Sequence, residues 1–591
     1  MNAMDAKGTR FHSNHPGYKW IALSNTTLGV LMATINQTIL IIALPVIFKG
    51  LQVNPLAGGG HGGQSGLLLW VLLGFNVATT ILLVTIGRLS DMYGRVKLYN
   101  LGFAIFTLGS IFCSITWGKG TDGEIQLIIF RLIQGVGGAF LFANSTAILT
   151  DSFPSNQRGF ALGLNQIAAI GGGVLGLIVG GLLAATGEWR WVFLVNVPVG
   201  IFGTVWAYIA LHEVGKEPGR SKIDIWGNLT LAVGLLAILV GLTYGIMPYK
   251  SHAMGWSNPW IIAALIGGFI VLILFVLIER VVSDPLFDLD LFKIRAFTYG
   301  NIASILSALA RGGLNFMVII WLQGIWLPLH GVAFSNTPLQ AGLDTIPQMI
   351  GFLIAGPVSG YLSDRFGQKL FATVGLVVAA IGFYLLNILP VDFHYWSFAF
   401  YIFLIGIGMG LFSSPNSAAI MNSVPARMRG AASGMRATFM NAGMMMSMGI
   451  FFSIVISGLA AKLPSAMTAG LAGTGLPSPL VHGLASLPPI ASLFAALLGY
   501  NPLKSLVPPQ ALHRLPLEVQ QRLVGHAFFP HLIGGAFQHG LRLAFIMSFI
   551  MLLVGALASL LRGKNFVYED AAQEQGQGQD DLPERAYGGR K

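Results

Sequence analysis

The sequence predicts an all-α membrane protein in which two six-helix bundles are joined by two inserted helices. The 591-residue chain has 10% charged residues, against about 25% in soluble globular proteins, and its mean hydropathy is +0.71. Apolar runs of about 20 residues, the length that crosses a bilayer, recur along the chain. A polar motif between two such runs occurs twice, which indicates an internal duplication.

The apolar runs predict fourteen membrane spans. Their approximate limits are 20–47, 66–86, 98–117, 125–150, 159–186, 190–212, 226–247, 258–282, 296–328, 337–362, 370–390, 396–422, 430–460 and 541–562. Lys and Arg are concentrated in the loops on one side, which the positive-inside rule assigns to the cytoplasm. Because the number of spans is even, we expect both termini to be cytoplasmic, in a multi-pass protein of the plasma (inner) membrane.

These spans divide the chain into bundles and connections. The predicted parts are a cytoplasmic tail (1–19), the first bundle (20–212), a linker with two extra transmembrane helices (213–295), the first five helices of the second bundle (296–460), an extracellular loop (461–540), the last span (541–562) and a disordered cytoplasmic tail (563–591). Apolar patches in the extracellular loop, such as 487–498, are too short to span. The loop is expected to form a folded cap, or alternatively amphipathic helices that rest on the membrane surface.

The repeated motif reads GRLSDMYGRVK at 87–97 and GYLSDRFGQK at 360–369. We expect a tight connection between two helices, because glycine adopts backbone conformations that other residues avoid. An aspartate is also stabilised near a helix N-terminus. The positions that matter are Gly87, Asp91, Gly94 and Arg95, and in the copy Gly360, Asp364 and Gly367. The alternative is that the motif only caps its loop and anchors it at the lipid headgroups.

Two shorter pairs extend the duplication. They are NS at 144–145 and 416–417, and RG at 158–159 and 429–430. Their order along the chain matches that of the repeated motif. The first six and the last six spans are therefore predicted to be related bundles.

Three other strings are characteristic of one family. They are WRWVFLVNVPVG at 189–200, PLFDLDLF at 285–292, and LQAGLDTIPQ followed by GPVSGYLSD within 339–364. Together with the repeated motif, they resemble the fourteen-span drug:proton antiporter branch of the major facilitator superfamily. The resemblance implies a secondary transporter that works by alternating access, in which the repeated motif latches the two bundles on the cytoplasmic side.

Arg131 lies about two turns inside the fourth predicted span. A buried arginine is costly in hydrocarbon and normally faces a cavity or a partner. Gln134 and Gly135 follow it as in the family's motif, and the resemblance implies that the arginine takes part in proton coupling. A structural ion pair is the alternative.

The first span departs from the family's pattern, which begins with an acid. This chain has Asn36 there, and an amide cannot release a proton near neutral pH. Asn36 and Gln37 are expected either to bind a polar group of the substrate or to bond to neighbouring helices. Proton coupling would then need another acid.

Asp344 is the acid that we place well inside a predicted span. At 1.5 Å per residue it is expected on the order of 10 Å from the outer end, where it is the candidate proton carrier; the alternative is that it caps the start of its helix. Arg311 and Arg436 are expected nearer the cytoplasm, where they could attract an anionic group. The methionines around Met440 suit a promiscuous binding surface, or are simply packed.

The fifth span carries a stripe of small residues, Gly172, Gly176, Gly180 and Gly181, which is typical of close helix packing. The resemblance implies an antiporter motif here, in which a proline follows the middle glycine. This chain has Leu177 at that position. The packing role is expected to persist without the proline kink.

The sequence carries no signature of an enzyme or of an ATP-driven pump. It has no phosphate-binding loop, no HExxH metal motif and one cysteine, Cys113. We expect no cofactor, no metal and no nucleic-acid partner. The expected partners are protons, membrane lipids and a small-molecule or lipid substrate, bound by a functional monomer.

The leading functional hypothesis is export of amphipathic or lipophilic compounds by proton antiport, as in multidrug efflux. One alternative is transport of a lipid or lipid-like anion, which the buried arginines and Asn36 favour. Another is a membrane receptor or scaffold that does not transport. Intact motifs in both halves argue against the last alternative.

Overall fold

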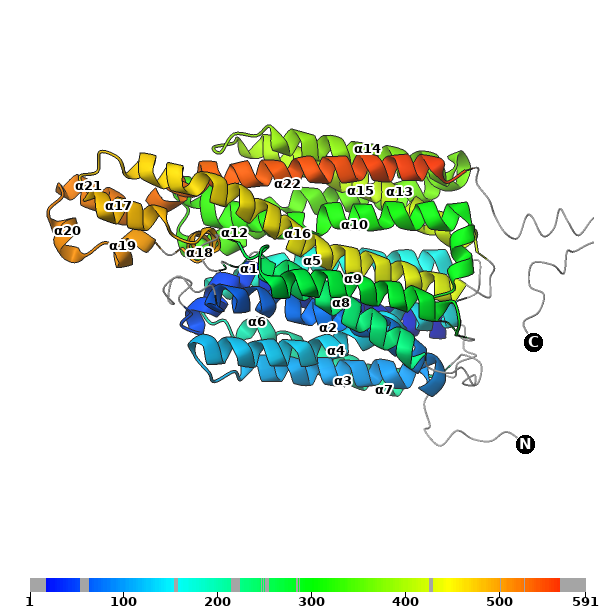
Figure 1. Cartoon of the computed structure of the whole chain (residues 1–591). Helices are drawn as coiled ribbons and strands as arrows, with labels where there is room; N and C mark the ends of the chain where they lie inside the picture. Colours follow the sequence, from blue (N-terminus) through cyan, green and yellow to red (C-terminus); the bar gives the residue numbers. More distant parts are fainter. Residues whose placement is uncertain are drawn as a thin grey trace, which may run out of the picture.

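Long helices run side by side through most of the molecule (Figure 1). The computed structural model describes residues 17–53, 63–153, 158–213, 224–282 except 246, 248 and 250–253, 285, 287–424, 429–499, 501–525 and 527–563. We call the end where α1 (Tyr18–Gly50) begins and α22 (Phe528–Leu561) ends the terminal end. The opposite end, where several short helices gather, is the cap end (Figure 1).

The first bundle contains six long helical segments. They are α1, α2 (Gly63–Tyr93), α3 (Arg95–Ser114), α4 (Gly120–Ser152), α5 (Arg158–Ala185), and α6 (Trp191–Leu194) continued by α7 (Asn196–Ala210). α1 packs on α5, α2 packs on α4, and α3 packs on both α4 and α7. The sixth segment is interrupted at Val195, because Pro198 has no N–H to donate to the carbonyl of Leu194.

The second bundle repeats this packing. Its helices are α10 (Arg295–Trp321) continued by the π-helical η3 (Leu322–Trp326) and α11 (Leu327–Leu329), α12 (Thr337–Asp344) with α13 (Ile346–Phe366), α14 (Gln368–Asn387), α15 (Tyr395–Asn422), α16 (Arg429–Leu471) and α22. α10 packs on α16, α13 on α15, and α14 on both α15 and α22, which are the counterparts of the pairs in the first bundle. The same arrangement in both bundles is what the duplication predicts.

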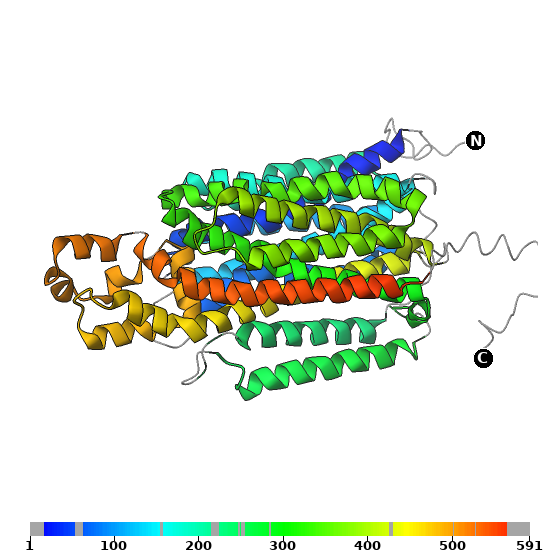
Figure 2. The same cartoon turned by 90° about the horizontal axis from the view of Figure 1, so that it is seen from above.

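Two helices between the bundles lie at the edge of the molecule. α8 (Ile225–Gly245) and α9 (Pro259–Glu279) run side by side there (Figure 2). In the most apolar stretch of α9 only 17% of the residues are buried by protein. Such an exposed apolar surface is suited to lipid. Two 3-10 segments, η2 (Leu289–Lys293) and η4 (Phe334–Asn336), complete the connections.

The repeated motif is helical over most of its length, which corrects the predicted limits of its flanking spans, 86 and 98. α2 continues to Tyr93 and α3 begins at Arg95, so Gly94 alone forms the turn, with a φ of 102°. In the copy, Gly367 forms the turn with a φ of 93°. A helix can extend past the first charged residue of a span until a residue stops it, and here only glycine accommodates the positive φ.

The cap end corrects two predicted span limits. α16 continues to Leu471 instead of ending near 460, and α22 begins at Phe528 instead of near 541. Five short helices lie between them: α17 (Ser478–Ala485), α18 (Pro489–Leu497), α19 (Pro502–Leu506), α20 (Pro509–His513) and α21 (Leu517–Val524). Every residue of α18 is buried, against η3, α16 and α2. The apolar patch at 487–498 thus forms a buried helix.

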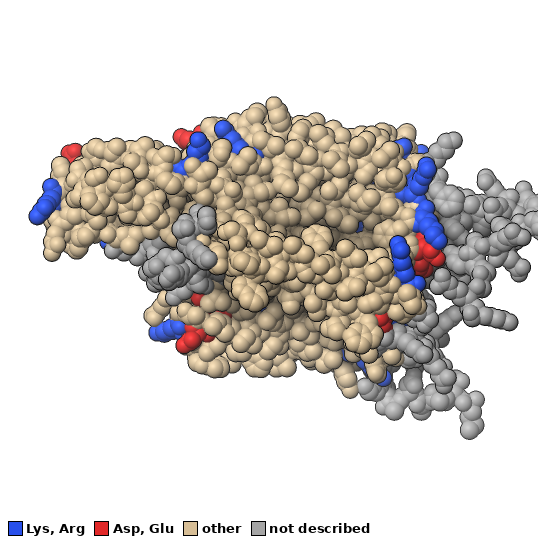
Figure 3. Space-filling view, in the orientation of Figure 1, with Lys and Arg blue, Asp and Glu red and all other residues tan. Residues whose placement is uncertain are grey.

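Within the described residues, twelve helices are long and apolar enough to cross a membrane, or thirteen if α17 and α18, bent by 87°, count as one broken span. Of the fourteen predicted spans, α2 and α12–α13 are absent from the twelve. In α2 the apolar stretch that was found, Leu67–Leu83, is shorter than 18 residues, whereas in α12–α13 polar residues, prolines and glycines lower the hydropathy. Figure 3 shows Lys, Arg, Asp and Glu near the two ends and a broad face without them between. The number of spans is therefore at least twelve by composition, and fourteen remains a prediction.

The glycines of α5 bring it against two partners. A Cβ added at Gly172, Gly176 or Gly180 would lie 3.0, 2.8 or 2.9 Å from a backbone oxygen of α1. A Cβ at Gly181 would instead lie 2.5 Å from the Cα of Leu339 in α12. α5 therefore packs on α1 through one face and meets the second bundle near the cap end, so the two bundles are in contact there.

Replacing Gly176 by alanine should destabilise the protein by about 1–3 kcal/mol, because the added methyl group would overlap α1. Gly171→Ala is the matched control, since nothing lies within 4 Å of a Cβ there. The stability of both variants is measured as the midpoint of thermal unfolding of the detergent-purified protein. We expect a lower midpoint for Gly176→Ala and an unchanged or higher one for Gly171→Ala; equal midpoints would contradict the packing argument.

Candidate functional site

Five buried polar side chains meet inside the first bundle and form what we call the polar centre. Asn36 comes from α1, Ser110 from α3, Arg131 and Gln134 from α4, and Asn196 from α7. Each is at most 2% exposed. Four of the bundle's helices therefore contribute to one polar site between apolar side chains.

Gln134 connects the members of the polar centre. Its Nε2 donates to Ser110 Oγ at 2.8 Å and to Asn36 Oδ1 at 3.1 Å. Its Oε1 accepts from Arg131 Nη1 at 2.7 Å and from Asn36 Nδ2 at 3.3 Å. One side chain thus links α1, α3 and the arginine.

Arg131 has no carboxylate partner among the described residues. Its Nε donates to the backbone oxygen of Val71 at 3.4 Å, and its guanidinium lies 5.0 Å from the centre of the Phe75 ring. Both residues belong to α2. The positive charge is therefore stabilised by dipoles and by an aromatic face rather than by an opposite charge.

Asn36 uses its amide on protein partners. Besides its two bonds with Gln134, its Oδ1 accepts from Asn196 Nδ2 at 3.3 Å. Of the two roles expected for it, this geometry favours bonding between helices. An amide suits the position because it both donates and accepts, which a carboxylate cannot do.

Asp344 lies apart from the polar centre, on α12 of the second bundle. It ends α12 and is 4% exposed. Gln340 Nε2 donates to its Oδ1 at 2.9 Å, while its Oδ2 has no partner among the described residues. The predicted span 337–362 is therefore two helices that break at Thr345, next to this acid.

The other predicted site residues are also separate from the polar centre. Arg311 on α10 and Arg436 on α16 each have a buried Nε without a partner in the described part of the chain. Arg436 Nη2 donates to Ser417 Oγ at 2.5 Å. Gln37 and Met440 are half-buried. The structure thus joins three of the predicted residues, Asn36, Arg131 and Gln134, and leaves the others apart.

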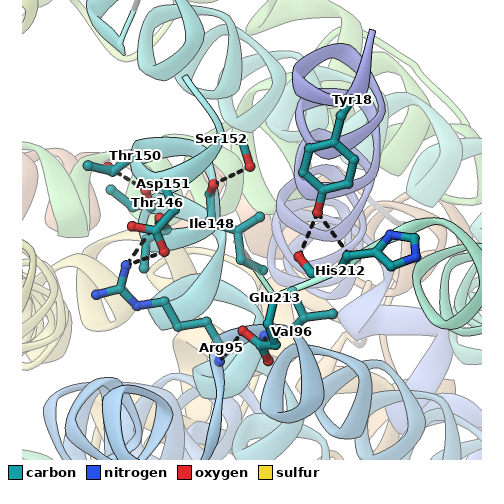
Figure 4. Close-up of polar contacts among 11 residues, drawn as sticks. Tyr18, Arg95, Val96, Thr146, Ile148, Thr150, Asp151, Ser152, His212 and Glu213 are labelled. Atoms are coloured by element: carbon teal, nitrogen blue, oxygen red, sulfur yellow. Dashed lines mark hydrogen bonds and ion pairs between the residues drawn. The ribbon is translucent and has the colours of Figure 1, made fainter. Parts of the chain in front are cut away.

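The terminal end of the first bundle holds a set of polar contacts around the Gly94 turn (Figure 4). Arg95 Nη1 forms an ion pair with Asp151 Oδ2 at 2.6 Å, which joins the start of α3 to the end of α4. The Glu213 carboxylate accepts from the backbone N–H groups of Arg95, Val96 and Lys97 at 3.2, 2.8 and 3.2 Å. An acidic side chain at this position satisfies free N–H groups and complements the helix dipole.

A tyrosine completes this region. The Tyr18 hydroxyl donates to the backbone oxygen of His212 at 2.7 Å and accepts from its N–H at 2.9 Å (Figure 4). The first turn of α1 is thereby fixed to the chain that leaves α7. The side chains of Asp91 and Asp364, both predicted latch residues, lie outside the described part.

Sequence reasoning missed several of these groups. Asn196 stands within the string 189–200, where a lone amide in an apolar run was an available signal. Ser110 gave no such signal in the sequence, because serine is common in membrane helices. Asp151, Glu213 and Tyr18 flank predicted spans and His212 ends one, and only the fold brings them to the region of the Gly94 turn.

The described residues include no group of three or more His, Cys, Asp or Glu side chains that could hold a metal ion. The chemistry that the polar centre offers is hydrogen bonding and one buried positive charge.

Comparison with known proteins agrees with this architecture. A riboflavin transporter, RibZ, of Clostridioides difficile is 29% identical over 442 residues, which is 75% of this chain and 89% of that protein. The multidrug transporter MdtP of Bacillus subtilis is 27% identical over 550 residues, 91% of this chain and 92% of that protein. A bacterial homologue of the lysosomal transporter Spinster, solved in an inward-facing conformation, shares the fold with a TM-score of 0.55 at 16% identity, over 93% of this chain and 98% of that one.

The family evidence covers most of the helical part of the chain. The sequence profile described as the Major Facilitator Superfamily matches residues 26–341 and 300–481. Its matches include the polar centre, the repeated motif and most of the second bundle. The chain is a membrane transporter that belongs to the Major Facilitator Superfamily.

Proposed function

We propose that this transporter exports amphipathic or lipophilic compounds in exchange for protons, by alternating access between the two bundles. The observation that carries the proposal is the polar centre, in which one buried positive charge and four hydrogen-bonding side chains sit among apolar helices. A site of this kind suits molecules with a large apolar body and few polar groups.

The names of related proteins support this substrate class. MdtP is named a multidrug transporter, and RibZ is named for riboflavin, which combines a flat aromatic ring system with a polar chain. The two relatives cover most of this chain at similar identity. The proposal therefore extends to planar amphipathic compounds as well as to drugs.

A lipid or lipid-like anion is the second candidate substrate. Arg131, Arg311 and Arg436 are cationic side chains inside the two bundles, and none forms an ion pair within the described residues. Uncompensated charge of this sign in a membrane protein favours an anionic ligand. A substrate panel that includes an anionic lipid separates the two candidates.

For the membrane orientation, we infer that the terminal end faces the cytoplasm and the cap end faces outward, in the plasma (inner) membrane. The concentration of Lys and Arg in loops at the terminal end supports this arrangement. The monomer holds both bundles and the polar centre. It is therefore proposed to be the functional unit.

The orientation can be tested by labelling single cysteines in intact cells. In a Cys113→Ser background, Arg514→Cys places a thiol on an exposed site beside α20, and Lys293→Cys places one on η2. A membrane-impermeant maleimide should label the first in intact cells and the second only after permeabilisation. The reverse pattern would refute the proposed orientation.

We infer that the ion pair at the Gly94 turn stabilises one of the two alternating conformations. Asp151→Asn should slow transport several-fold while membrane insertion stays normal, because the partly exposed Arg95 loses this ion pair. Arg95→Gln should have a similar effect, and the double variant should add little, as expected for residues that act as a pair. The initial rate of transport in proteoliposomes measures each variant, with Lys97→Gln as the control. Losses in rate that add up in the double variant would contradict the pairing.

Proton coupling is proposed to use Asp344, because Asn36 cannot titrate. Purified protein is reconstituted with ethidium, riboflavin or a fluorescent anionic phospholipid, with and without a pH gradient. We expect gradient-driven transport in the wild type and its loss in Asp344→Asn, with downhill exchange retained. Asp392→Asn is the control, since that carboxylate is 82% exposed at the same end.

Normal gradient-driven transport by Asp344→Asn would exclude this residue. A wild type that ignores the gradient would exclude antiport and favour a facilitator or a lipid carrier. Gradient-driven transport of the phospholipid alone would select the second candidate substrate.

A further inference from the structure

Glu124 is a fully buried acid that neither the repeated motif nor the polar centre includes. The predicted fourth span begins at 125, but α4 begins at Gly120, so Glu124 lies inside the helix near the cap end. Its side chain is 0% exposed. Neither of its carboxylate oxygens has a hydrogen-bond partner among the described residues.

This arrangement is unusual for an acid near the start of a helix. Acidic side chains there ordinarily accept hydrogen bonds from the free N–H groups of the first turn or remain in water. Glu124 does neither. A buried polar group without a partner is destabilising, and an ionised carboxylate much more so than a neutral carboxyl group. A structural role therefore does not account for a carboxyl group at this position.

Arg131 lies on the same face of α4, seven residues further along. Seven residues make nearly two turns, or about 10 Å along the helix. This separation is too great for an ion pair, but in an apolar interior two charges influence each other more strongly than they would in water. The first bundle thus contains a buried acid and a buried base on one helix face, each without an oppositely charged partner in the described part of the chain.

Few other charges lie near this end of the helices packed against α4. Lys49, near the end of α1, and Lys119, directly before α4, are both exposed. The described side chains of α2 include no titratable group before Arg88, Cys113 lies near the end of α3, and Glu188 and Arg190 follow α5. Arg190 Nη2 donates to the backbone oxygen of Thr116, and Asp122 on α4 itself is exposed. None of them forms an ion pair with Glu124. Arg131 is the buried charge that shares a helix face with Glu124.

We propose that Glu124 is a proton-carrying residue of the first bundle, an inference that rests on the proposed antiport. When the cap end opens, a carboxylate oxygen takes a proton from a hydronium ion, so that an O–H bond forms and a water molecule is released. When the bundles rearrange, the same O–H bond breaks and the proton passes to water on the other side. The neutral form tolerates the apolar surroundings, whereas the ionised form is costly there.

Infrared spectroscopy tests whether the Glu124 carboxyl group takes up and releases a proton, and it needs no substrate. Difference spectra of the reconstituted protein between acidic and alkaline pH should contain a protonated-carboxyl band that is absent from Glu124→Gln. Glu124→Asp should retain a shifted band, and Asp122→Asn, which removes an exposed neighbouring carboxylate, should retain the band that Glu124→Gln loses. An unchanged spectrum for Glu124→Gln would overturn the proposal, because the residue would then not titrate.

Transport tests whether this proton is the coupled one. With ethidium, riboflavin and the fluorescent anionic phospholipid, Glu124→Gln should reduce gradient-driven transport to the level seen without a gradient and keep downhill exchange. Glu124→Asp should restore part of the gradient-driven rate with a displaced pH profile. A merely structural role would instead reduce exchange and gradient-driven transport together, and that result would overturn the proposal.

The two proposals can fail separately. Loss of gradient-driven transport in Asp344→Asn but not in Glu124→Gln overturns the Glu124 assignment and leaves antiport intact. A wild-type protein that ignores the gradient overturns antiport itself, and with it the coupling role of Glu124.

Discussion

The positive charge of Arg131 has to be stabilised inside an apolar bundle without a carboxylate, and much of the first bundle is arranged to do so. The guanidinium needs hydrogen-bond acceptors, which Gln134 and the backbone of α2 supply. Gln134 in turn has to be held in one orientation, which Ser110 and Asn36 achieve. The helices α1, α2, α3 and α7 are therefore positioned around one side chain of α4. Moving any of them would leave a buried polar group without its partner.

Close helix packing is the second constraint, and it connects the polar centre to the rest of the protein. In a bilayer, helices gain little from the hydrophobic effect, so they associate through small residues and close contact. The glycines of α5 allow it to approach α1, the helix that carries Asn36, while Gly181 on another face of α5 meets α12. α12 ends at Asp344. A shift of α5 between the bundles would therefore change helix contacts both beside the polar centre and beside Asp344 of the second bundle.

Much of the fold could be predicted because its signals are local in the sequence. The length of the apolar runs and the repeated motif were enough to predict the two bundles and the long helices. The limits of helices were harder to predict. Hydropathy placed the start of the fourth span at 125, the end of the thirteenth at 460 and the start of the last at 541, whereas helices continue until a residue such as Gly94 stops them. Of the site, Asn36, Arg131 and Gln134 were predictable from charge and from the family's pattern. Glu213 and Tyr18 were not, because their roles depend on contacts between residues far apart in the sequence.

The duplication is preserved in the scaffold but not in the charges. Asn165 Nδ2 donates to Ser145 Oγ at 2.7 Å in the first bundle, and Arg436 Nη2 donates to Ser417 Oγ at 2.5 Å in the second. The two serines are repeat partners, so the same hydrogen bond is made by a neutral side chain in one bundle and by a cation in the other. Conversely, Phe403 occupies the position in the second bundle that corresponds to Arg131. Of the three arginines predicted for the site, one thus lies on α4 of the first bundle and two lie on α10 and α16 of the second. Two bundles of the same shape with different charges present different environments to a molecule between them, so rearranging one against the other changes which charges that molecule meets.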